Sequence, residues 1–340
     1  MLTETASTSS NSPNCTYSKD DTTQPKTSLK VDKLTLLIDL QPQLSEGIDS
    51  YLIGVISDTA LSASWGFNRA PGKGFKVSIA GRVPVSDDPL IWSKETAYHL
   101  QAGPKRPGVA AIRLDLNPVI FTPAGITYLK EVLETAFCVE WVWLAGARVN
   151  RVDAALDLHG IRIDDWIWDM PQRKKRHIIS NAGRTETIYL GDKKCRPMVI
   201  YDKAAQAKLP VGNNVTRIEY RSRGSHSPAG LLKMPCPFDK LTVSNAATLP
   251  LPPPARAMFA GYARANGISA ALDAFPVEAR KKFKAQISAS RPSWWNPATI
   301  WATWPDVLRS TLPILFEPKL VLKPLFKSID LGPDPELVDD

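Results

Sequence analysis

Charged residues alternate with apolar residues along the stretch 151–158. Arg151, Asp153 and Asp157 stand at odd positions, and the even positions are Val, Ala, Leu and Leu. Successive side chains of a β-strand point to opposite faces, so a strand here would bury its apolar residues and present the charged ones together. The stretch therefore predicts a strand with one apolar face and one face that carries two carboxylates.

A second stretch repeats this alternation, with Glu219 between two arginines on one face. If the two strands are neighbours with these faces aligned, Asp153, Asp157 and Glu219 converge and repel one another unless a cation lies between them. Carboxylate oxygens suit Mg²⁺ or Mn²⁺, so the three acids are the predicted metal ligands. The alternative is that they are surface charges paired with neighbouring arginines, which is the commoner case for a single strand aspartate.

Two tyrosines each end an apolar, strand-like stretch just before a turn. A phenol has a pKa of about 10, so as a nucleophile it needs a base or a nearby positive charge. Lys203 follows Tyr201 by two residues and would share its face if the strand continues, which makes Tyr201 the predicted nucleophile and Tyr189 the reserve. The alternative is that both are ordinary strand tyrosines with buried rings and hydrogen-bonded hydroxyls.

The chain has a net charge of +8, and its basic residues concentrate in the middle segment beside these acids and tyrosines. An excess of positive charge favours a polyanionic partner, of which nucleic acid is the commonest, although a charge run is more often a solvated face. The residues predicted to contact DNA are Arg151, Arg173, Lys174, Lys175, Arg176, Lys193, Lys194, Arg196, Arg217, Arg221 and Arg223.

The elements that must position these residues are strands with few helices. In the first half, a strand from Val31, a hairpin about the turn 70–74 and a strand over 108–118 precede a helix that Thr122 caps. In the second half, a strand over 148–160, a short helix or loop over 164–177 and three further strands follow. This order predicts an α+β fold, an antiparallel sheet with packed helices, and suggests a duplicated strand-helix unit.

The composition divides the chain into four parts. Residues 1–28 are predicted to be a disordered tail, 29–246 the main domain, 247–330 a proline-rich linker with a small helical module, and 331–340 an acidic tail. The four cysteines have no spacing typical of a disulfide framework or a zinc site. No stretch has the run of about 18 apolar residues that a membrane span needs, so we expect a cytoplasmic protein with no membrane partner.

The stretches "NRVDAALDLHG", "ETIYLGDKKCRPMVIYDKA" and "VTRIEYRSRG", in this order, resemble the motifs of the trans-acting replication initiators of rolling-circle plasmids and filamentous phages. The resemblance covers roughly residues 30–225, and its middle motif is the most specific. It implies an enzyme that recognises a double-stranded origin and nicks one strand through a tyrosine, which becomes joined to the 5′ phosphate. It further implies a divalent metal that polarises the phosphate, and a second transesterification that releases a closed circle.

Residue by residue, Tyr201 matches the motif tyrosine and Lys203 the lysine beside it, while Asp153, Asp157 and Glu219 match the acidic positions. The motif often has an arginine and a serine where this chain has Val and Cys at 199 and 195. Two other functions stay open: a noncatalytic DNA-binding repressor or copy-control protein, and a metal-dependent nuclease that activates water. The helical module could read the origin or recruit a host helicase, and the sequence decides neither between plasmid and phage nor between monomer and homodimer.

Overall fold

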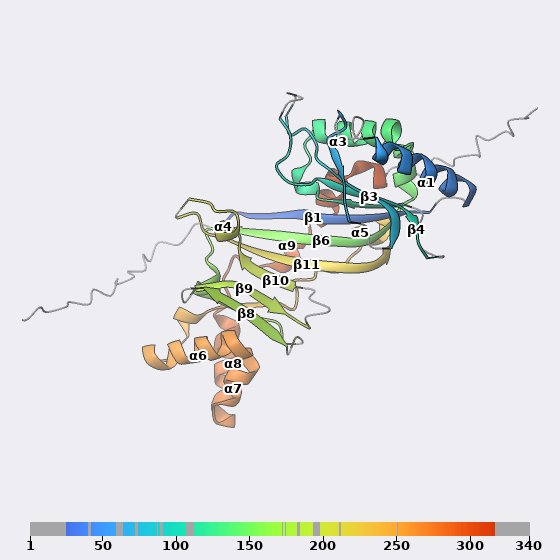
Figure 1. Ribbon diagram of the computed structural model, residues 1–340. Coiled ribbons are helices and arrows are strands. Elements are labelled where there is room, and N and C mark those ends of the chain that lie inside the picture. The colour runs from blue at the N-terminus through green and yellow to red at the C-terminus, as the bar shows by residue number, and fades with distance from the viewer. Residues whose placement is uncertain are drawn as a thin grey trace, which may run out of the picture.

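The computed structural model describes residues 25–316, except 40–41, 59–63, 72–73, 87, 89–90, 107–111, 172, 174, 182–183, 193–197, 211 and 250. The predicted acidic tail and nearly all of the predicted N-terminal tail lie outside the described residues. The described chain is an α+β fold built on one large antiparallel sheet (Figure 1), which confirms the predicted fold class.

The large sheet has ten strands, all antiparallel to their neighbours. Across the sheet their order is β2 (Phe67–Arg69), β3 (Phe75–Gly81), β4 (Tyr98–Pro104), β5 (Ile112–Leu116), β1 (Thr27–Ile38), β6 (Arg148–His159), β11 (Val215–His226), β10 (Met198–Asp202), β9 (Arg184–Leu190) and β8 (Arg176–Asn181).

The strand order is symmetric about its centre. β1 and β6, the first strands of the two halves of the chain, pair with each other in the middle. On one side of this pair, β5 pairs with β1, and β4, β3 and β2 follow outward. On the other side, β11 pairs with β6, and β10, β9 and β8 follow outward. The topology therefore has the duplication that the succession of elements suggested, as a two-fold relation between the halves.

One face of the sheet carries the core. On β6 the even positions, Val152, Ala154, Leu156 and Leu158, are fully buried, as the alternation predicted. Helices cover this apolar side, and the cap predicted at the start of α3 is present because the Thr122 side chain accepts a hydrogen bond from Gly125 N at 3.2 Å. The helices described in the first half are α1 (Pro42–Ser57), η1 (Pro118–Ile120), α3 (Pro123–Glu131), η2 (Val132–Ala136) and η3 (Trp141–Gly146).

The segment predicted as a short helix or loop contains a strand. η4 (Ile163–Asp165) leads into β7 (Trp166–Asp169), which pairs with β12 (Thr242–Asn245) in a separate two-stranded sheet. Because the partner strand lies far along the chain, no local pattern marks the pairing. Three further short helices of the second half are α4 (Lys203–Gln206), α5 (Pro228–Leu232) and η5 (Ala246–Thr248).

The C-terminal helices pack in two places. Helices α6 (Pro253–Asn266), α7 (Ile268–Asp273) and α8 (Val277–Ala289) form a small hydrophobic cluster of their own beside β7 and β8 (Figure 1). In contrast, α9 (Pro297–Trp301), α10 (Trp304–Thr311) and η6 (Pro313–Phe316) join the core under the large sheet. The Trp301 and Trp304 rings stack there with centroids 4.6 Å apart, so these tryptophans fill the core of the sheet.

Candidate active site on the open face of the sheet

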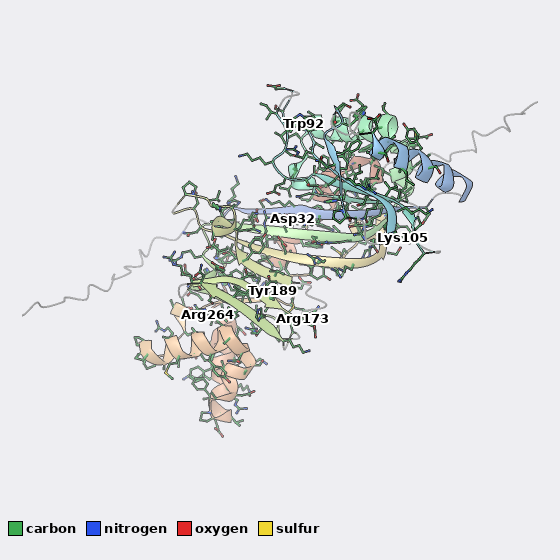
Figure 2. All side chains as sticks on the ribbon, in the orientation of Figure 1. Asp32, Trp92, Lys105, Arg173, Tyr189 and Arg264 are labelled. Carbon is green, nitrogen blue, oxygen red and sulfur yellow. The ribbon has the colours of Figure 1, made fainter. Side chains whose placement is uncertain are left out.

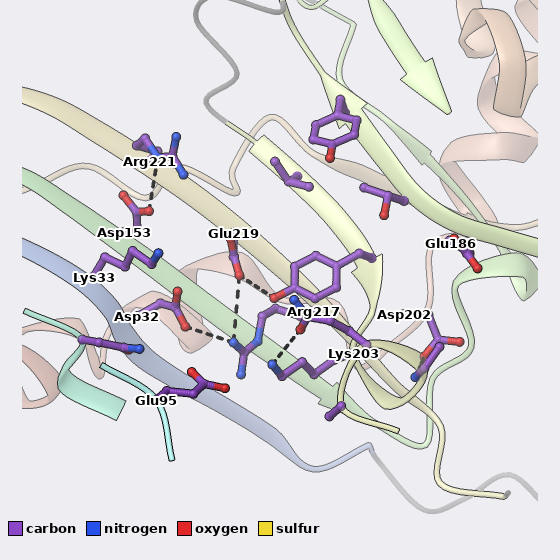
Figure 3. A pocket seen from close by; sticks show the side chains of 18 residues that line it. Asp32, Lys33, Glu95, Asp153, Glu186, Asp202, Lys203, Arg217, Glu219 and Arg221 are labelled. Atoms are coloured by element: carbon purple, nitrogen blue, oxygen red, sulfur yellow. Dashed lines mark hydrogen bonds and ion pairs between the residues drawn. The ribbon is translucent and has the colours of Figure 1, made fainter. Parts of the chain in front are cut away.

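The two charged stretches lie on neighbouring strands, as the alternation required. β6 and β11 pair so that Arg217 lies opposite Asp157 and Arg221 opposite Asp153. On the other side of β11, Tyr201 of β10 lies opposite Arg217. The polar face of these strands forms one wall of a cavity of about 980 Å³, which β1, β9 and α4 also line (Figure 3).

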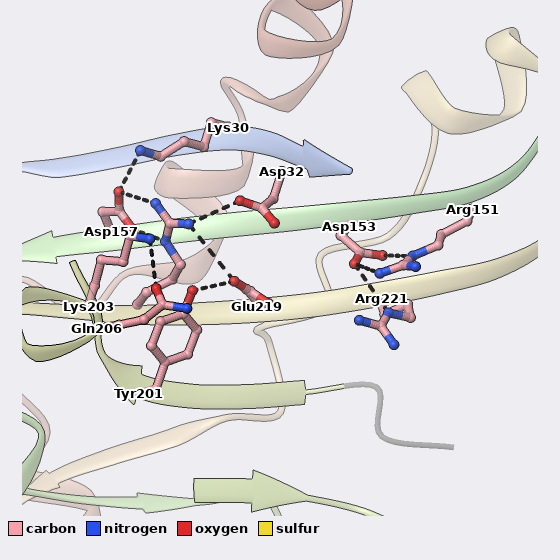
Figure 4. Close-up of polar contacts among 11 residues, drawn as sticks. Lys30, Asp32, Arg151, Asp153, Asp157, Tyr201, Lys203, Gln206, Glu219 and Arg221 are labelled. Atoms are coloured by element: carbon pink, nitrogen blue, oxygen red, sulfur yellow. Dashed lines mark hydrogen bonds and ion pairs between the residues drawn. The ribbon is translucent and has the colours of Figure 1, made fainter. Parts of the chain in front are cut away.

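The Tyr201 hydroxyl points at a carboxylate. It donates a hydrogen bond to Glu219 Oε1 at 2.5 Å, and both side chains line the cavity (Figure 4). Burial, together with the hydrogen bond to Glu219 and its charge, raises the pKa of Tyr201, so the phenol keeps its proton in the resting protein. Burial also raises the pKa of Glu219, which makes this carboxylate a stronger base toward the phenol.

Arg217 is the centre of the polar network. Its guanidinium donates to Asp157 at 2.5 and 3.0 Å and to Asp32 at 3.0 Å, and it lies 3.9 Å from Glu219. The Lys30 ammonium also pairs with Asp157, at 2.6 Å. Burial opposes the charged form of Asp157, yet the hydrogen bonds from Arg217 and Lys30 lower the pKa of this carboxyl below its usual value. Asp157 is therefore a buried support for Arg217 that does not line the cavity.

Asp153 is held by two other arginines. Its carboxylate accepts hydrogen bonds from Arg151, one of them at 2.8 Å, and from Arg221 at 3.2 Å. The three acids predicted to bind a metal are thus engaged separately, Asp153 and Asp157 by cations and Glu219 by Tyr201. Over the described ranges, no three His, Cys, Asp or Glu side chains are grouped so that they could hold a metal ion. A metal at Asp153, Asp157 and Glu219 stays a prediction.

A short helix places Lys203. The strand ends at Asp202, whose side chain caps α4 by accepting from Ala205 N at 2.9 Å, and Lys203 is the first helical residue. Its Nζ donates to Gln206 Oε1 at 2.7 Å and lines the cavity with Tyr201. Burial and the charge of Arg217 lower the pKa of Lys203, so its ammonium releases a proton more readily than an exposed lysine.

The reserve nucleophile lies in the same cavity. Tyr189 of β9 (Figure 2) is opposite Val199 of β10, where the motif often has an arginine, and both line the cavity. The Tyr189 ring lies 6.1 Å from that of His177. The hydrogen bond to Glu219 belongs to Tyr201, which makes Tyr201 the better candidate.

Asp32, Lys30 and Gln206 belong to the site although the sequence did not single them out. Asp32 falls at an irregularity of β1 between Val31 and Lys33, where the register with β6 shifts. An ideal alternation would not bring it beside Arg217. The detectable signal is two consecutive charges, Asp32 and Lys33, which break the alternation of the strand.

The basic residues predicted to contact DNA have different surroundings. Arg176 is buried, pairs with Asp169 and donates to the carbonyls of Ala263 and Arg264 at 3.0 and 2.8 Å, so it ties α6 to the sheet. Its contact with DNA stays a prediction. Lys175 forms an exposed pair with Asp192 at 2.8 Å. Arg223 is exposed and Arg173 is half-buried, whereas Lys174, Lys193, Lys194 and Arg196 lie outside the described residues.

None of the helices in the described part of the chain has the length and apolar character that a membrane-spanning segment needs. No protein-family model matches the chain, and no curated protein matches it. Among solved structures, the chain is similar to a rolling-circle replication initiator protein from Geobacillus stearothermophilus. That similarity has 14% sequence identity and a TM-score of 0.32, and covers 85% of this chain and 97% of the other. A TM-score this low carries no weight for function, which rests on the residues of the site.

Proposed function

We propose that the protein starts rolling-circle replication by nicking and rejoining one DNA strand through a 5′-phosphotyrosyl bond to Tyr201. The observation that carries this proposal is the 2.5 Å hydrogen bond from the Tyr201 hydroxyl to Glu219 inside a cavity that Arg217 and Lys203 also line. A nucleophile, a base and two cations in one polar cavity are the groups that phosphoryl transfer to a phenol requires.

The cleavage step follows from these contacts. Glu219 takes the Tyr201 proton, and the charge of Arg217 favours the phenolate because it lowers the pKa of Tyr201 against the effect of burial. The phenolic oxygen forms a bond to phosphorus while the bond from phosphorus to the 3′ oxygen breaks. The departing 3′ oxygen takes a proton from the Lys203 ammonium, whose pKa is lowered.

Rejoining is the reverse of these transfers. The neutral Lys203 amine accepts the proton of an incoming 3′ hydroxyl, and the protonated Glu219 returns its proton to the Tyr201 oxygen as the phosphotyrosyl bond breaks. Both groups regain their starting protonation, so a second transesterification leaves the enzyme unchanged. The divalent metal that would polarise the phosphate stays a prediction, as do helicase recruitment, dimerisation and a cytoplasmic location.

The decisive experiment looks for the covalent adduct. Single-stranded origin DNA labelled on the 3′ side of the cleavage site is incubated with the protein in Mg²⁺, in Mn²⁺ or in chelator, then denatured and separated on a gel. We expect a protein-DNA adduct that Tyr201→Phe abolishes while DNA binding is retained, and that Tyr189→Phe leaves intact. The chelator lane tests the metal prediction separately.

Each of the other outcomes indicates a different nucleophile or a different activity. An adduct that survives Tyr201→Phe and is lost in Tyr189→Phe assigns the reserve tyrosine. Cleaved DNA without an adduct indicates a nuclease that activates water. Salt-sensitive binding with neither product indicates a noncatalytic DNA-binding protein, and would overturn the proposal.

A further inference from the structure

The first half of the sheet contains a counterpart of the Tyr201 site. In each half, the strand beside the central pair carries an arginine and an acid two residues apart on the open face. These are Arg217 and Glu219 on β11, and Arg113 and Asp115 on β5. Because the strand order is symmetric about β1 and β6, the two pairs occupy equivalent places.

The counterpart lacks the nucleophile. On β10, Tyr201 lies opposite Arg217, and on β4 the residue opposite Arg113 is Gln101. The Gln101 amide nitrogen donates to Ser78 Oγ at 3.3 Å. An amide cannot form the ester that a phenol forms, so the first half is equipped for binding but not for this chemistry.

A second cavity marks this place. It has a volume of about 400 Å³, and Arg113, Asp115 and His99 line it. Lys33, Glu95 and Asn117 line both this cavity and the larger one around Tyr201. The two cavities therefore adjoin along the open face of the sheet, and Lys33 of the central strand is one of the residues that they share.

Two acids line the second cavity, Asp115 and Glu95, and the carboxylate of Asp115 is occupied. Asp115 accepts two hydrogen bonds from Arg113, both at 3.0 Å, and another from Thr35. Arg151, which also lines the cavity, pairs with Asp153. Lys33 is exposed and makes no ion pair with any residue that the structure describes. Its ammonium is thus available to an anion that spans both cavities.

We propose that the second cavity binds the backbone of the same single strand of DNA, at a phosphate next to the one that Tyr201 attacks, and that Lys33 guides the strand between the cavities. This proposal rests on the proposed function, because it places the uncleaved part of that substrate. Arg113 presents a side chain that is 35% exposed, and it lines the same cavity as Lys33. Phosphate contacts of this kind position a strand without reading its sequence.

The test measures binding separately from cleavage. The full-length protein is titrated into a fluorescent 12-nucleotide oligothymidylate at several salt concentrations, and fluorescence anisotropy is followed. We expect Lys33→Ala to weaken binding about three- to tenfold and to reduce the salt slope by about one. We expect Thr96→Lys to tighten binding by a similar factor, because Thr96 is exposed and lines the second cavity, so the lysine adds a cation there, and a misfolded variant could not give this result.

Lys240→Ala is the matched control, since Lys240 is exposed and lines neither cavity. If Lys33→Ala and Thr96→Lys both bind like Lys240→Ala, the second cavity does not hold DNA and the inference is overturned. The Tyr201 adduct would still form in that case, so the proposed function would stand. Loss of the adduct in the wild-type protein would instead refute the proposed function, whatever the binding data show.

Discussion

At the scale of single residues, the acids of the site have different roles, which their hydrogen-bond and ion-pair partners determine. Glu219 contacts the nucleophile, whereas Asp157 contacts only the cations that support it. The sequence placed both acids on one face but could not separate these roles, because alternation determines the face and not the partner. The supporting role of Asp157 depends on its ion pair with Lys30 of β1, a strand from the other half of the chain.

The pH dependence of adduct formation tests the role of Glu219. Only the carboxylate can accept the Tyr201 proton, and burial raises the pKa of Glu219 above its usual value of about 4.3. The rate should therefore be lost as the pH falls through this raised pKa and level off above it. Glu219→Gln keeps an acceptor oxygen for the hydrogen bond but cannot take a proton, so we expect a rate about 10²- to 10⁴-fold lower without the acidic limb.

Single-turnover adduct formation from pH 4 to 8 provides the measurement. The exposed Glu278→Gln on α8 is a control with no contact to the cavity, and it should keep the wild-type profile. An acidic limb that persists unchanged in Glu219→Gln would show that another group is the base.

At the scale of elements, the sequence predicted regular pieces well and irregular ones poorly. Alternation located β6 and β11, and the cap at Thr122 located the start of α3. The irregularity of β1 that brings Asp32 to Arg217 could not be predicted, because it depends on how β1 pairs with β6. For the same reason, β7 could not be distinguished from a loop before its distant partner was known.

Helix α4 provides the test at this scale, because it places Lys203 at the start of a capped turn. If Lys203 donates a proton to the departing 3′ oxygen, Lys203→Ala should slow cleavage about 10²-fold or more. Gln206→Ala removes the hydrogen bond that positions the ammonium and should slow it about tenfold. A substrate with sulfur in place of that oxygen has a leaving group that needs no proton, so both variants should cleave it at nearly the wild-type rate.

Rates on the oxygen and sulfur substrates are compared for each variant. Gln101→Ala is a glutamine control on the other half of the sheet, outside the Tyr201 cavity, and its ratio of oxygen to sulfur rates should equal that of the wild type. If Lys203→Ala slows the cleavage of both substrates by the same factor, Lys203 holds the phosphate and donates no proton.

At the scale of the whole molecule, the sheet must be stable with one face open, because the cavities occupy that face. The opposite face therefore carries the hydrophobic core, and the chain returns to it at its C-terminal end. Trp304 is fully buried there and donates from Nε1 to the Leu231 carbonyl at 3.0 Å. The sequence predicted a separate helical module for this segment. The tryptophans instead join the main core, because they pack against segments far away in the chain.

Replacing Trp304 tests this dependence. Trp304→Ala removes a large buried ring and its stacking on Trp301, so we expect the free energy of unfolding to fall by about 3–5 kcal/mol in urea titrations. Tyr262→Ala on α6, where the ring is 52% exposed, should change it by about 0.5 kcal/mol or less. Because Trp304 lies on the covered face, the fraction of Trp304→Ala that stays folded at low temperature should still form the Tyr201 adduct. Equal stability of the two variants would instead mean that the C-terminal helices are not part of the core that supports the open face.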